Sequence, residues 1–413
     1  MRILLCAYYP FFGEHLAGGL QVSVGTLVRG FVDRGHQVVI LCPECEPRPR
    51  FAAPAAPGLE VLPVLREQRA ETVSPTDVSH NLREIRRAAE STDLVWSLDR
   101  SFPVQVSQPV VLSLSAVCYE NELSALFGLT WDHLIVPSDF VMRLVDDWLP
   151  RDSAGGEGRG RQSIPPPLGP IFRHQERRPG ADAAALRLRL GLPGSRRYLL
   201  FPHRPEDGKG HELALKVLAE LLRHAGPTSH GEKNARRGYQ DGSFHMLIPR
   251  PPLSRSIDIA AEANYLRQIE GEAARLGVSD HVTFHDWVDY RDLPAYYSLG
   301  ECCLFLSRLP ESFGLALVQS IACGTFVVSS GSGALEETVP TGAGHVLVAN
   351  PDPGAVARAV LDGCPESDLR RGQAWVAEAY DPGRIVDAYL DCFVAVRRTW
   401  EARHGDQARV QMR

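Results

Sequence analysis

One segment of the sequence places an acidic side chain and a run of backbone amides at the start of a predicted helix. The apolar run Cys302–Leu306 ends at a polar turn, 311–314, that contains Glu311, and a helical pattern follows from Leu315 to Cys323. The first N–H groups of a helix lack intrahelical acceptors and lie at its positive end. This turn can therefore bind an anion or the hydroxyls of a sugar. The alternative is an ordinary strand–turn–helix unit of an α/β sheet.

A second segment places two cations near a strand end. Arg204 follows the apolar run that ends at Pro202, and Lys209 lies between Gly208 and Gly210 at the start of the next predicted helix. The chain contains only 3 lysines against 41 arginines, so a lysine at this point is not generic surface charge. An arginine fork and a lysine point charge can together neutralise a diphosphate. The alternative is a solvated basic turn.

A glycine pair, Gly18 and Gly19, follows the first predicted strand and precedes a helix. A glycine-rich turn at this point lets backbone amides approach a phosphate. The pair completes neither the GxGxxG pattern of dinucleotide sites nor the GxxxxGK[ST] pattern of P-loops. By itself it is a weak signal.

Acidic residues are concentrated in the first part of the chain. Residues 1–150 contain 12 arginines, no lysine, and 18 aspartates or glutamates, whereas the rest of the chain is balanced, with 32 charges of each sign. An acidic half is a poor surface for nucleic acid or anionic lipid. It suits a cationic small molecule, although surface acidity that serves solubility is the alternative.

Short apolar runs alternate with helical patterns along both halves, which is typical of parallel, doubly wound sheets. In the first half the predicted strands are Ile3–Ala7, Val38–Leu41, Leu94–Ser97, Val110–Leu114 and Leu134–Val136, and the predicted helices are Val22–Arg34, Asn81–Glu90 and Asp139–Trp148, the last capped by Ser138. After a polar, glycine-rich stretch, Asp152–Ser163, which we interpret as a linker, the pattern resumes with the strands Tyr198–Pro202, His245–Pro249, Val282–Phe284, Cys302–Leu306 and Thr325–Ser329 and the helices His211–His224, Asn264–Leu276 and Pro382–Arg403.

The length of 413 residues predicts two domains, because one core rarely extends beyond about 250–300 residues. We expect domains at 1–170 and 171–384, with a C-terminal helix at about 385–403 that packs back on the first domain and a frayed tail at 404–413. The sequence contains no run of 18 apolar residues, so we expect no membrane-spanning helix. The nine cysteines, several of which lie within apolar runs, agree with a cytoplasmic location.

Taken together and in order, these features resemble the GT-B glycosyltransferases, in particular the retaining family 4 of glycogen-synthase-like and sucrose-synthase-like enzymes. The resemblance covers nearly the whole chain, and the matching segments are Gly18–Gly19, Arg34–Val38, Arg204 with Lys209, Val282–Phe284, Leu293–Tyr297, Glu311–Leu315, Ala322–Gly324 and Gly333–Glu337. It implies an α/β fold with two doubly wound Rossmann-like domains that face each other across a cleft.

The resemblance also implies roles for individual residues. Arg204 and Lys209 would bind the donor diphosphate and stabilise the departing nucleotide, and Gly19 would approach the same diphosphate from the first domain. Glu311 would accept hydrogen bonds from the sugar hydroxyls, helped by the amides of Phe313, Gly314 and Leu315. The two cations would replace a divalent ion, so neither a metal nor another cofactor is expected.

Two positions depart from the family pattern. Gln319 stands where the family has a second glutamate, which would accept hydrogen bonds from both ribose hydroxyls, whereas an amide accepts through one oxygen and offers an NH2 group. The preferred nucleotide is therefore open. Ser115 stands where the family often has a histidine near the transferred sugar, so no side-chain base is assigned. A retaining mechanism in which the leaving phosphate accepts the proton fits this sequence.

The acceptor site is expected on the first domain. We expect Ser115, Glu120 and Glu122 to contact the acceptor. The two glutamates follow a predicted strand end within the acidic half and could pair with the ammonium groups of an aminated sugar or aminocyclitol. A solvated acidic turn is the alternative.

The sequence therefore predicts a metal-independent, retaining glycosyltransferase that moves a hexose, N-acetylglucosamine or glucose, from a nucleotide sugar, UDP-linked, to a hydroxyl of a small aminated acceptor such as an aminoglycoside antibiotic precursor. One alternative is a transferase for a polysaccharide or a lipid-linked glycan, which would favour a basic patch on the first domain. The other is an inactive nucleotide-sugar-binding regulator. The oligomeric state stays open.

Overall fold

The computed structural model divides the chain into two compact units, Met1–Gly169 with Tyr380–Arg413, and Pro170–Ala379. We call them unit 1 and unit 2. The residues that the structure describes are 1–7, 19–43, 57–66, 74–99, 106–117, 120–128, 131–151, 159–172, 181–194, 196–224, 244–250 and 259–411.

Unit 1 contains a parallel sheet of seven strands in the order β3-β2-β1-β4-β5-β6-β7. The strands are β1 (Arg2–Cys6), β2 (Gln37–Pro43), β3 (Leu59–Leu65), β4 (Leu94–Leu98), β5 (Val110–Ser113), β6 (His133–Val136) and β7 (Gly160–Ser163). The helices are α1 (Gly19–Asp33), α2 (Pro75–Ala89), α3 (Glu120–Phe127), α4 (Asp139–Trp148) and α14 (Pro382–Gln411). The strand order reverses direction between β1 and β4, which in open α/β sheets is where ligands bind, at the carboxyl ends of the strands.

Unit 2 contains a second parallel sheet, with six strands in the order β10-β9-β8-β11-β12-β13. The strands are β8 (Arg197–Leu200), β9 (Phe244–Pro249), β10 (Val282–His285), β11 (Gly300–Phe305), β12 (Phe326–Ser329) and β13 (His345–Leu347). The α-helices are α5 (Ala181–Arg189), α6 (His211–His224), α8 (Ile259–Arg275), α9 (Leu293–Leu299), α10 (Leu315–Ala322), α11 (Leu335–Thr338), α12 (Pro353–Asp362) and α13 (Glu366–Ala379), and short 3₁₀ turns lie at Pro170–Phe172, Ser279–His281 and Tyr290–Asp292.

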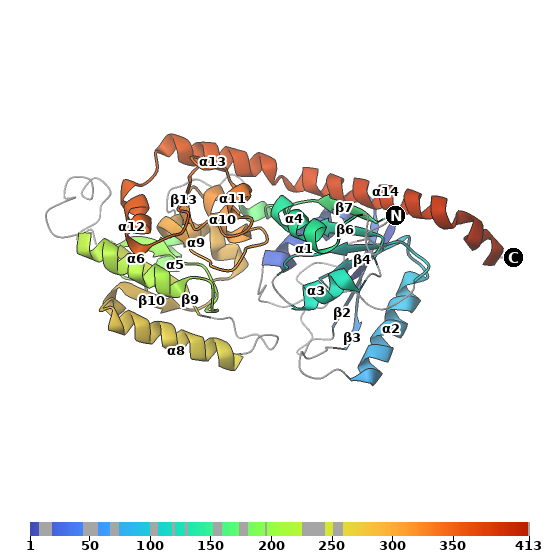
Figure 1. Cartoon of the computed structure of the whole chain (residues 1–413), viewed down its shortest axis with the longest axis horizontal. Coiled ribbons are helices and arrows are strands. Elements are labelled where there is room, and N and C mark those ends of the chain that lie inside the picture. The colour runs from blue at the N-terminus through green and yellow to red at the C-terminus, as the bar shows by residue number, and fades with distance from the viewer. Residues whose placement is uncertain are drawn as a thin grey trace. The chain divides into compact units, whose positions relative to one another are not determined.

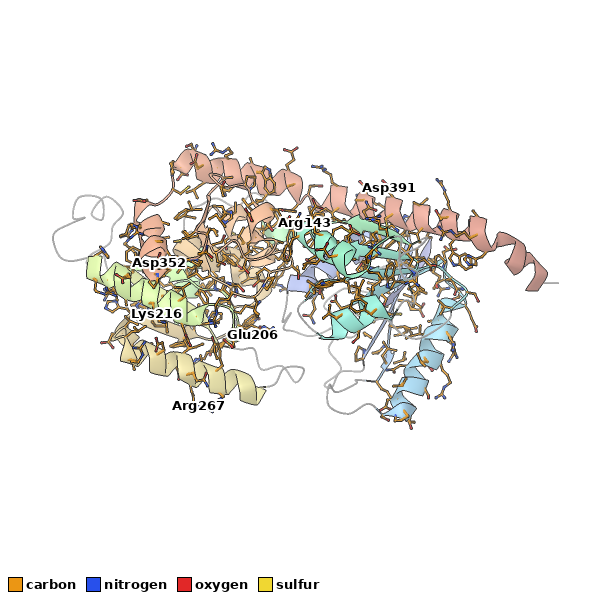
Figure 2. All side chains as sticks on the ribbon, viewed as in Figure 1. Arg143, Glu206, Lys216, Arg267, Asp352 and Asp391 are labelled. Carbon is orange, nitrogen blue, oxygen red and sulfur yellow. The ribbon has the colours of Figure 1, made fainter. Side chains whose placement is uncertain are left out.

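Apolar side chains fill the space between each sheet and its helices, while charged side chains such as Arg143 of α4, Arg267 of α8 and Asp391 of α14 are exposed (Figures 1 and 2). In unit 2 one continuous core joins strands β8, β9 and β11 to helices α6, α8 and α12. The two parallel α/β sheets confirm the predicted fold class of two Rossmann-like domains. Among the described residues, no helix has the length and apolar content that crossing a bilayer requires.

The C-terminal helix α14 packs on α1 within unit 1 (Figure 1, red). Its Tyr389 and Phe393 rings contact Phe31 of α1 and Trp96 of β4, with ring centroids between 5.6 and 6.4 Å apart. Residues from the two ends of the chain thus share one aromatic core. The helix extends to Gln411, so the prediction of a frayed tail from residue 404 is wrong for 404–411. The residues from 406 to 411 are mostly good helix formers, which explains the continuation.

The predicted linker Asp152–Ser163 is also partly wrong. Residues 160–163 form β7, the edge strand of the first sheet, which pairs with β6 through the backbone. Backbone pairing does not require apolar side chains at an edge, so hydropathy alone misses such a strand. Residues 152–158 lie outside the described part of the chain. The predicted cap of α4 is confirmed, because Ser138 accepts a hydrogen bond from the Val141 amide at 3.2 Å.

Two histidines, the fully buried His211 and the half-buried His203, lie together at the junction of β8 and α6. The rings of His203 and His211 each lie within 5 Å, centroid to centroid, of the Phe201 ring, and His203 also contacts Phe305. Burial favours the neutral imidazole and lowers the pKa of each histidine from 6.5 to about 3. Unit 2 therefore folds with both rings uncharged at neutral pH.

This burial predicts an acid-sensitive fold. As the pH falls below 6.5, the unfolded chain takes up a proton at each of these histidines before the folded chain does, so the free energy of unfolding decreases between pH 6.5 and about 3. Between pH 7.5 and 5.5, each group should contribute about 1 kcal/mol to the decrease. Urea unfolding followed by circular dichroism should give a smaller decrease for His211→Leu. The exposed His224, on the same helix, provides the control variant His224→Leu, and equal decreases in both variants would contradict the prediction.

Candidate functional site in unit 2 and its counterpart in unit 1

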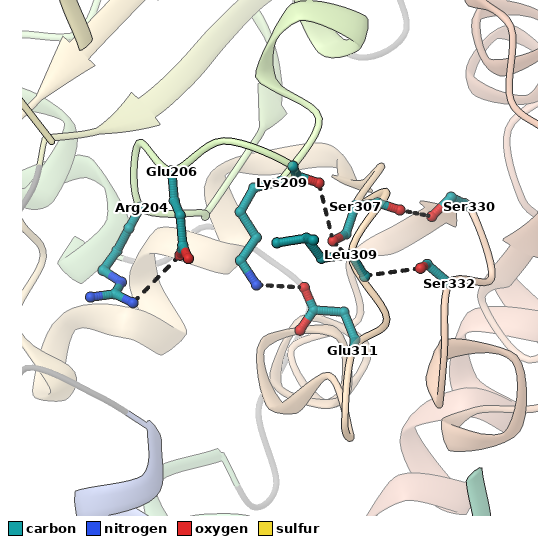
Figure 3. A network of polar contacts seen from close by, with 9 residues as sticks. Arg204, Glu206, Lys209, Ser307, Leu309, Glu311, Ser330 and Ser332 are labelled. Atoms are coloured by element: carbon teal, nitrogen blue, oxygen red, sulfur yellow. Dashed lines mark hydrogen bonds and ion pairs between the residues drawn. The ribbon is translucent and has the colours of Figure 1, made fainter. Parts of the chain in front are cut away.

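The structure brings together two of the predicted site residues from distant parts of the sequence. Lys209 follows β8, Glu311 follows β11, and Lys209 Nζ lies 2.9 Å from Glu311 Oε1 (Figure 3). Both side chains retain some exposure, 16% for the lysine and 19% for the glutamate. Both strands are central and parallel, so their carboxyl ends meet at one edge of the sheet. The pair therefore offers one positive and one negative group at the edge where α/β folds bind ligands.

Glycines allow the two loops to touch through their backbones. The Gly208 carbonyl accepts a hydrogen bond from the Arg308 amide at 2.7 Å. Gly210 has a φ of +91°, and a Cβ there would lie 2.2 Å from the carbonyl oxygen of Leu306. Only glycine fits this contact. The glycines beside Lys209 thus hold the lysine against the loop that presents Glu311.

A third loop, after β12, fixes the other side of Glu311. The Glu311 amide donates to the Ser332 carbonyl at 3.3 Å, and the Glu311 carbonyl accepts from the Ala334 amide at 2.7 Å. A Cβ on Gly333 would lie 2.4 Å from the Glu311 carbonyl oxygen. The hydroxyl of Ser332 donates to the Leu309 carbonyl at 2.9 Å, and Ser330 donates to the Ser307 carbonyl at 2.8 Å (Figure 3). Glu311 is therefore held on both sides by backbone contacts.

The predicted turn before α10 is confirmed in its geometry. Gly314 precedes the helix with a φ of +87°, and α10 begins at Leu315. A Cβ on Gly314 would also lie 2.4 Å from Leu335 Cδ2, but it is the positive φ that favours glycine here. The Phe313 ring is buried and its carbonyl accepts from the Thr338 hydroxyl. The first amide of α10, that of Leu315, thus lies four residues after Glu311, as the sequence predicted.

Carboxylates accompany each of the basic side chains around this site. Arg204 lies 3.6 Å from Glu206 and Arg308 lies 3.3 Å from Asp207, besides the pair of Lys209 with Glu311. Arg204 retains 35% exposure and the Glu206 side chain 28%. A bound diphosphate would have to compete with Glu206 for Arg204. The sequence analysis did not select Glu206, although an acid between the two cations is visible in Arg204–Lys209.

Gln319 lies on the buried face of α10, four residues after Leu315. Its side-chain oxygen accepts a hydrogen bond from the Tyr297 hydroxyl at 3.3 Å, and the residue is 4% exposed. Burial raises the pKa of Tyr297 well above 10, so this hydroxyl is a donor at neutral pH. The one oxygen of the amide is thus already engaged by the protein. A ribose contact of Gln319 stays a prediction, and the structure adds Tyr297 as its partner.

Unit 1 contains the remaining predicted residues. Gly19 is the first residue of α1, Gly18 lies outside the described residues, and Glu120 and Glu122 belong to α3, although their side chains are outside the described part. Ser115 follows β5 and is half-buried. Its amide and its hydroxyl both donate, at 2.5 Å, to the two carboxylate oxygens of Asp99.

Asp99 was missed by the sequence analysis. It follows the apolar strand β4 directly and has a φ of +53°, which aspartate tolerates better than most residues. An acid at the end of a buried strand was the available signal. The proposed roles of Arg204, Lys209, Glu311, Gly19 and Ser115 stay predictions, since no ligand marks them. Among the described residues, no three acidic, cysteine or histidine side chains are grouped so as to hold a metal ion.

The geometry of the site yields a prediction for Glu206. Replacement by glutamine removes the carboxylate that competes for Arg204, so the nucleotide of the predicted donor, UDP, is expected to bind about twofold to fivefold more tightly, within the range of a partly exposed ion pair. Isothermal titration calorimetry measures this directly. Glu220→Gln on α6, whose carboxylate pairs with Arg223, is the matched control. Weaker UDP binding in Glu206→Gln would instead mean that Glu206 orients the arginine.

Comparisons with known proteins find glycosyltransferases that are similar in sequence or in fold. Residues 251–371 match the family model of glycosyl transferases group 1. The chain is 34% identical over 228 residues to a D-inositol 3-phosphate glycosyltransferase of Acidothermus cellulolyticus, over 54% of this chain and 46% of that protein. The alignment thus spans about half the length of this curated relative, as it does for a Streptomyces griseus protein of the same name, which is 31% identical over 56% of this chain and 47% of its own.

Solved structures match over almost the whole chain. Sucrose-phosphate synthase from Thermosynechococcus elongatus superposes with a TM-score of 0.71 at 19% identity, over 95% of this chain and 99% of that one. Anabaena HepE in complex with UDP gives 0.67 at 15% identity, over 96% of this chain and 100% of its own. At these identities the similarity shows the fold. The family match supports the resemblance for residues 251–371, and the superpositions support its fold.

Proposed function

We propose that this chain, which has the GT-B fold and a group 1 glycosyl transferase region, is a hexosyltransferase that moves a sugar from a UDP-sugar to a hydroxyl of a small acceptor. The observation that supports this best is the contact of Lys209 with Glu311. It places a cation for a diphosphate beside a carboxylate for sugar hydroxyls, and a nucleotide sugar contains both groups side by side. The comparison with HepE, which binds UDP, supports the choice of nucleotide.

The donor occupies unit 2 in this proposal. Lys209 and Arg204 bind the diphosphate, and the first amides of α10 face its negative charge or the sugar hydroxyls. Glu311 accepts hydrogen bonds from the sugar hydroxyls. As the bond between the anomeric carbon and the diphosphate breaks, negative charge grows on the phosphate oxygen, where the two cations stabilise it. The two cations do the work of a divalent ion, so we propose transfer without a metal.

Transfer with retention of the anomeric configuration fits the absence of a base at position 115. The acceptor oxygen bonds to the anomeric carbon on the face from which the diphosphate leaves, and the leaving phosphate oxygen accepts the acceptor proton. A serine hydroxyl is itself too weak a base to take the acceptor proton at neutral pH, so we assign Ser115, whose hydroxyl donates to Asp99, no role as the general base. We further propose a cytoplasmic location.

The acceptor contacts unit 1, and we propose an aminated acceptor of the aminoglycoside type. The net charge of −6 on residues 1–150 supports a cationic ligand. The curated relatives are named for an inositol phosphate, and a cyclic polyol is common to both acceptor types. An inactive sugar-nucleotide-binding regulator is the second candidate, favoured by the engagement of Gln319 with Tyr297.

Removal of the lysine tests the proposed function. Lys209→Met keeps most of the side-chain volume but removes the charge that stabilises the leaving diphosphate, so transfer from UDP-glucose or UDP-N-acetylglucosamine should slow by on the order of 100-fold. Hydrolysis of the UDP-sugar by water, measured as UDP release without added acceptor, should slow by the same factor. Lys216→Met, on α6 beyond the loop, is the matched control and should retain activity. Equal turnover of both variants would contradict the diphosphate role, and no UDP release by the parent protein would favour the regulator.

Position 319 gives a second test. Gln319→Glu supplies a carboxylate with two oxygens, of which one can accept from Tyr297 and the other from a ribose hydroxyl. UDP should then bind more tightly, by about 1 kcal/mol or fivefold, as measured by calorimetry with UDP, GDP and dTDP. Gln37→Glu, at the exposed start of β2, is the control. Unaltered affinity for all three nucleotides would mean that position 319 does not contact the ribose.

A further inference from the structure

A small polar network in unit 1 lies at the point where the strand order reverses. Asp99 follows β4 and Ser115 follows β5, and the Asp99 amide extends the pairing of these strands by donating to the Ser113 carbonyl at 2.9 Å. β4 is the neighbour of β1, on the other side of the reversal. Side chains at the carboxyl ends of these strands face the position where open α/β sheets bind ligands.

Hydrogen bonds and ring packing hold the network from several sides. Beneath it, the indole N–H of the fully buried Trp96 donates to the Ser113 hydroxyl at 2.8 Å. The Tyr389 ring of α14 packs against Trp96 with centroids 5.6 Å apart. Asp99 itself is 3% exposed. Its carboxylate is therefore fixed by the strand, by the buried layer below and by the two hydrogen bonds from Ser115.

The direction of one hydrogen bond determines what Ser115 can bind. A serine hydroxyl has one hydrogen to donate, and a carboxylate can only accept. The 2.5 Å contact of Ser115 Oγ with Asp99 Oδ2 must therefore use the serine hydrogen. What remains on the half-buried Ser115 Oγ is lone pairs. This oxygen can only accept a hydrogen bond from a ligand, and the neighbouring carboxylate strengthens it as an acceptor.

We propose that Asp99 is a positioning and specificity residue, which fixes Ser115 Oγ as a contact for a hydroxyl or ammonium group of the acceptor and disfavours a phosphate or carboxylate there. This inference rests on the proposed function and names the acceptor class, a neutral or cationic polyol. A phosphate group near pH 7 offers almost only acceptor oxygens, so it cannot form a hydrogen bond with the lone pairs of Ser115 Oγ. The Asp99 carboxylate behind Ser115 would also repel its negative charge. The curated relatives, named for an inositol 3-phosphate, would differ from this chain in that respect.

The variant Asp99→Asn reverses the polarity of the contact. Asparagine tolerates the same positive φ, and its oxygen can still accept from the Ser115 amide. Its NH2 group then faces Ser115 Oγ as a donor, so the serine hydroxyl is free to donate outward. The kcat/KM should rise for a phosphate-bearing acceptor and fall for an amine. A residue that only supports the fold would change both in the same direction.

The experiment uses the full chain, UDP-glucose or UDP-N-acetylglucosamine, and three acceptors: 2-deoxystreptamine, myo-inositol and inositol 3-phosphate. We expect the parent protein to prefer the first two by kcat/KM, and Asp99→Asn to lower the amine-to-phosphate ratio roughly tenfold. Ser115→Ala should raise the KM of the preferred acceptor. Asp93→Asn is the matched control, because Asp93 precedes the same strand and accepts from the Arg2 amide at 2.7 Å. It should leave the ratio unchanged.

Three results would overturn the inference. They are a parent protein that prefers the phosphate ester, an Asp99→Asn variant that alters all acceptors by one factor, and an effect of Ser115→Ala confined to the affinity for the UDP-sugar. Calorimetric binding of the three acceptors in the presence of UDP provides the same ratio where turnover is too slow, and failure of every acceptor to bind overturns it too. The proposed function is tested separately. It is contradicted when the parent protein releases no UDP from the UDP-sugar in water, or when Lys209→Met releases UDP at the same rate as the parent protein.

Discussion

The contact of Lys209 with Glu311 depends on three loops of unit 2 that touch one another through their backbones. At each point of contact a glycine occupies a place where a Cβ would overlap a neighbouring atom, 2.2 Å from the Leu306 carbonyl at Gly210 and 2.4 Å from the Glu311 carbonyl at Gly333. Side chains at a site can be replaced one by one, but these backbone contacts cannot be rebuilt by repacking. The position of the charged pair is therefore determined by the glycines in these loops.

Charge compensation is the second property that the site depends on. Each basic group near the proposed diphosphate position has a carboxylate of the same unit close by. Such pairs keep the free protein from exposing bare positive charge, and they also reduce its attraction for any anion. The net contribution of the cations to donor binding is thus the difference between their interaction with the diphosphate and their interaction with these carboxylates, as it is for most ion pairs at a protein surface. Unit 1 uses a related arrangement, in which a carboxylate sets the direction of a serine hydroxyl.

The fold and the donor side of the site could be predicted from the sequence because both depend on local patterns. Buried parallel strands are continuous apolar runs, and the turn before α10 is marked by Gly314 and by the helical pattern after it. The edge strand β7 could not be predicted, since its pairing uses only the backbone. The partners Tyr297 of Gln319 and Asp99 of Ser115 could not be predicted either, because a hydrogen bond between residues 16 or 22 positions apart has no sequence period.

The discontinuity of unit 1 has a consequence for synthesis on the ribosome. Its core needs α14, whose Tyr389 and Phe393 cover Phe31 and Trp96, and Gly30 of α1 is close enough to Val386 that a Cβ would lie 2.4 Å from it. In the chain, α14 follows unit 2. Unit 2 is contiguous and can fold as it emerges, whereas the N-terminal sheet, although translated earlier, keeps an uncovered aromatic surface until α14 has been synthesised. Chaperone binding during translation should accordingly concentrate on the N-terminal residues until this helix emerges.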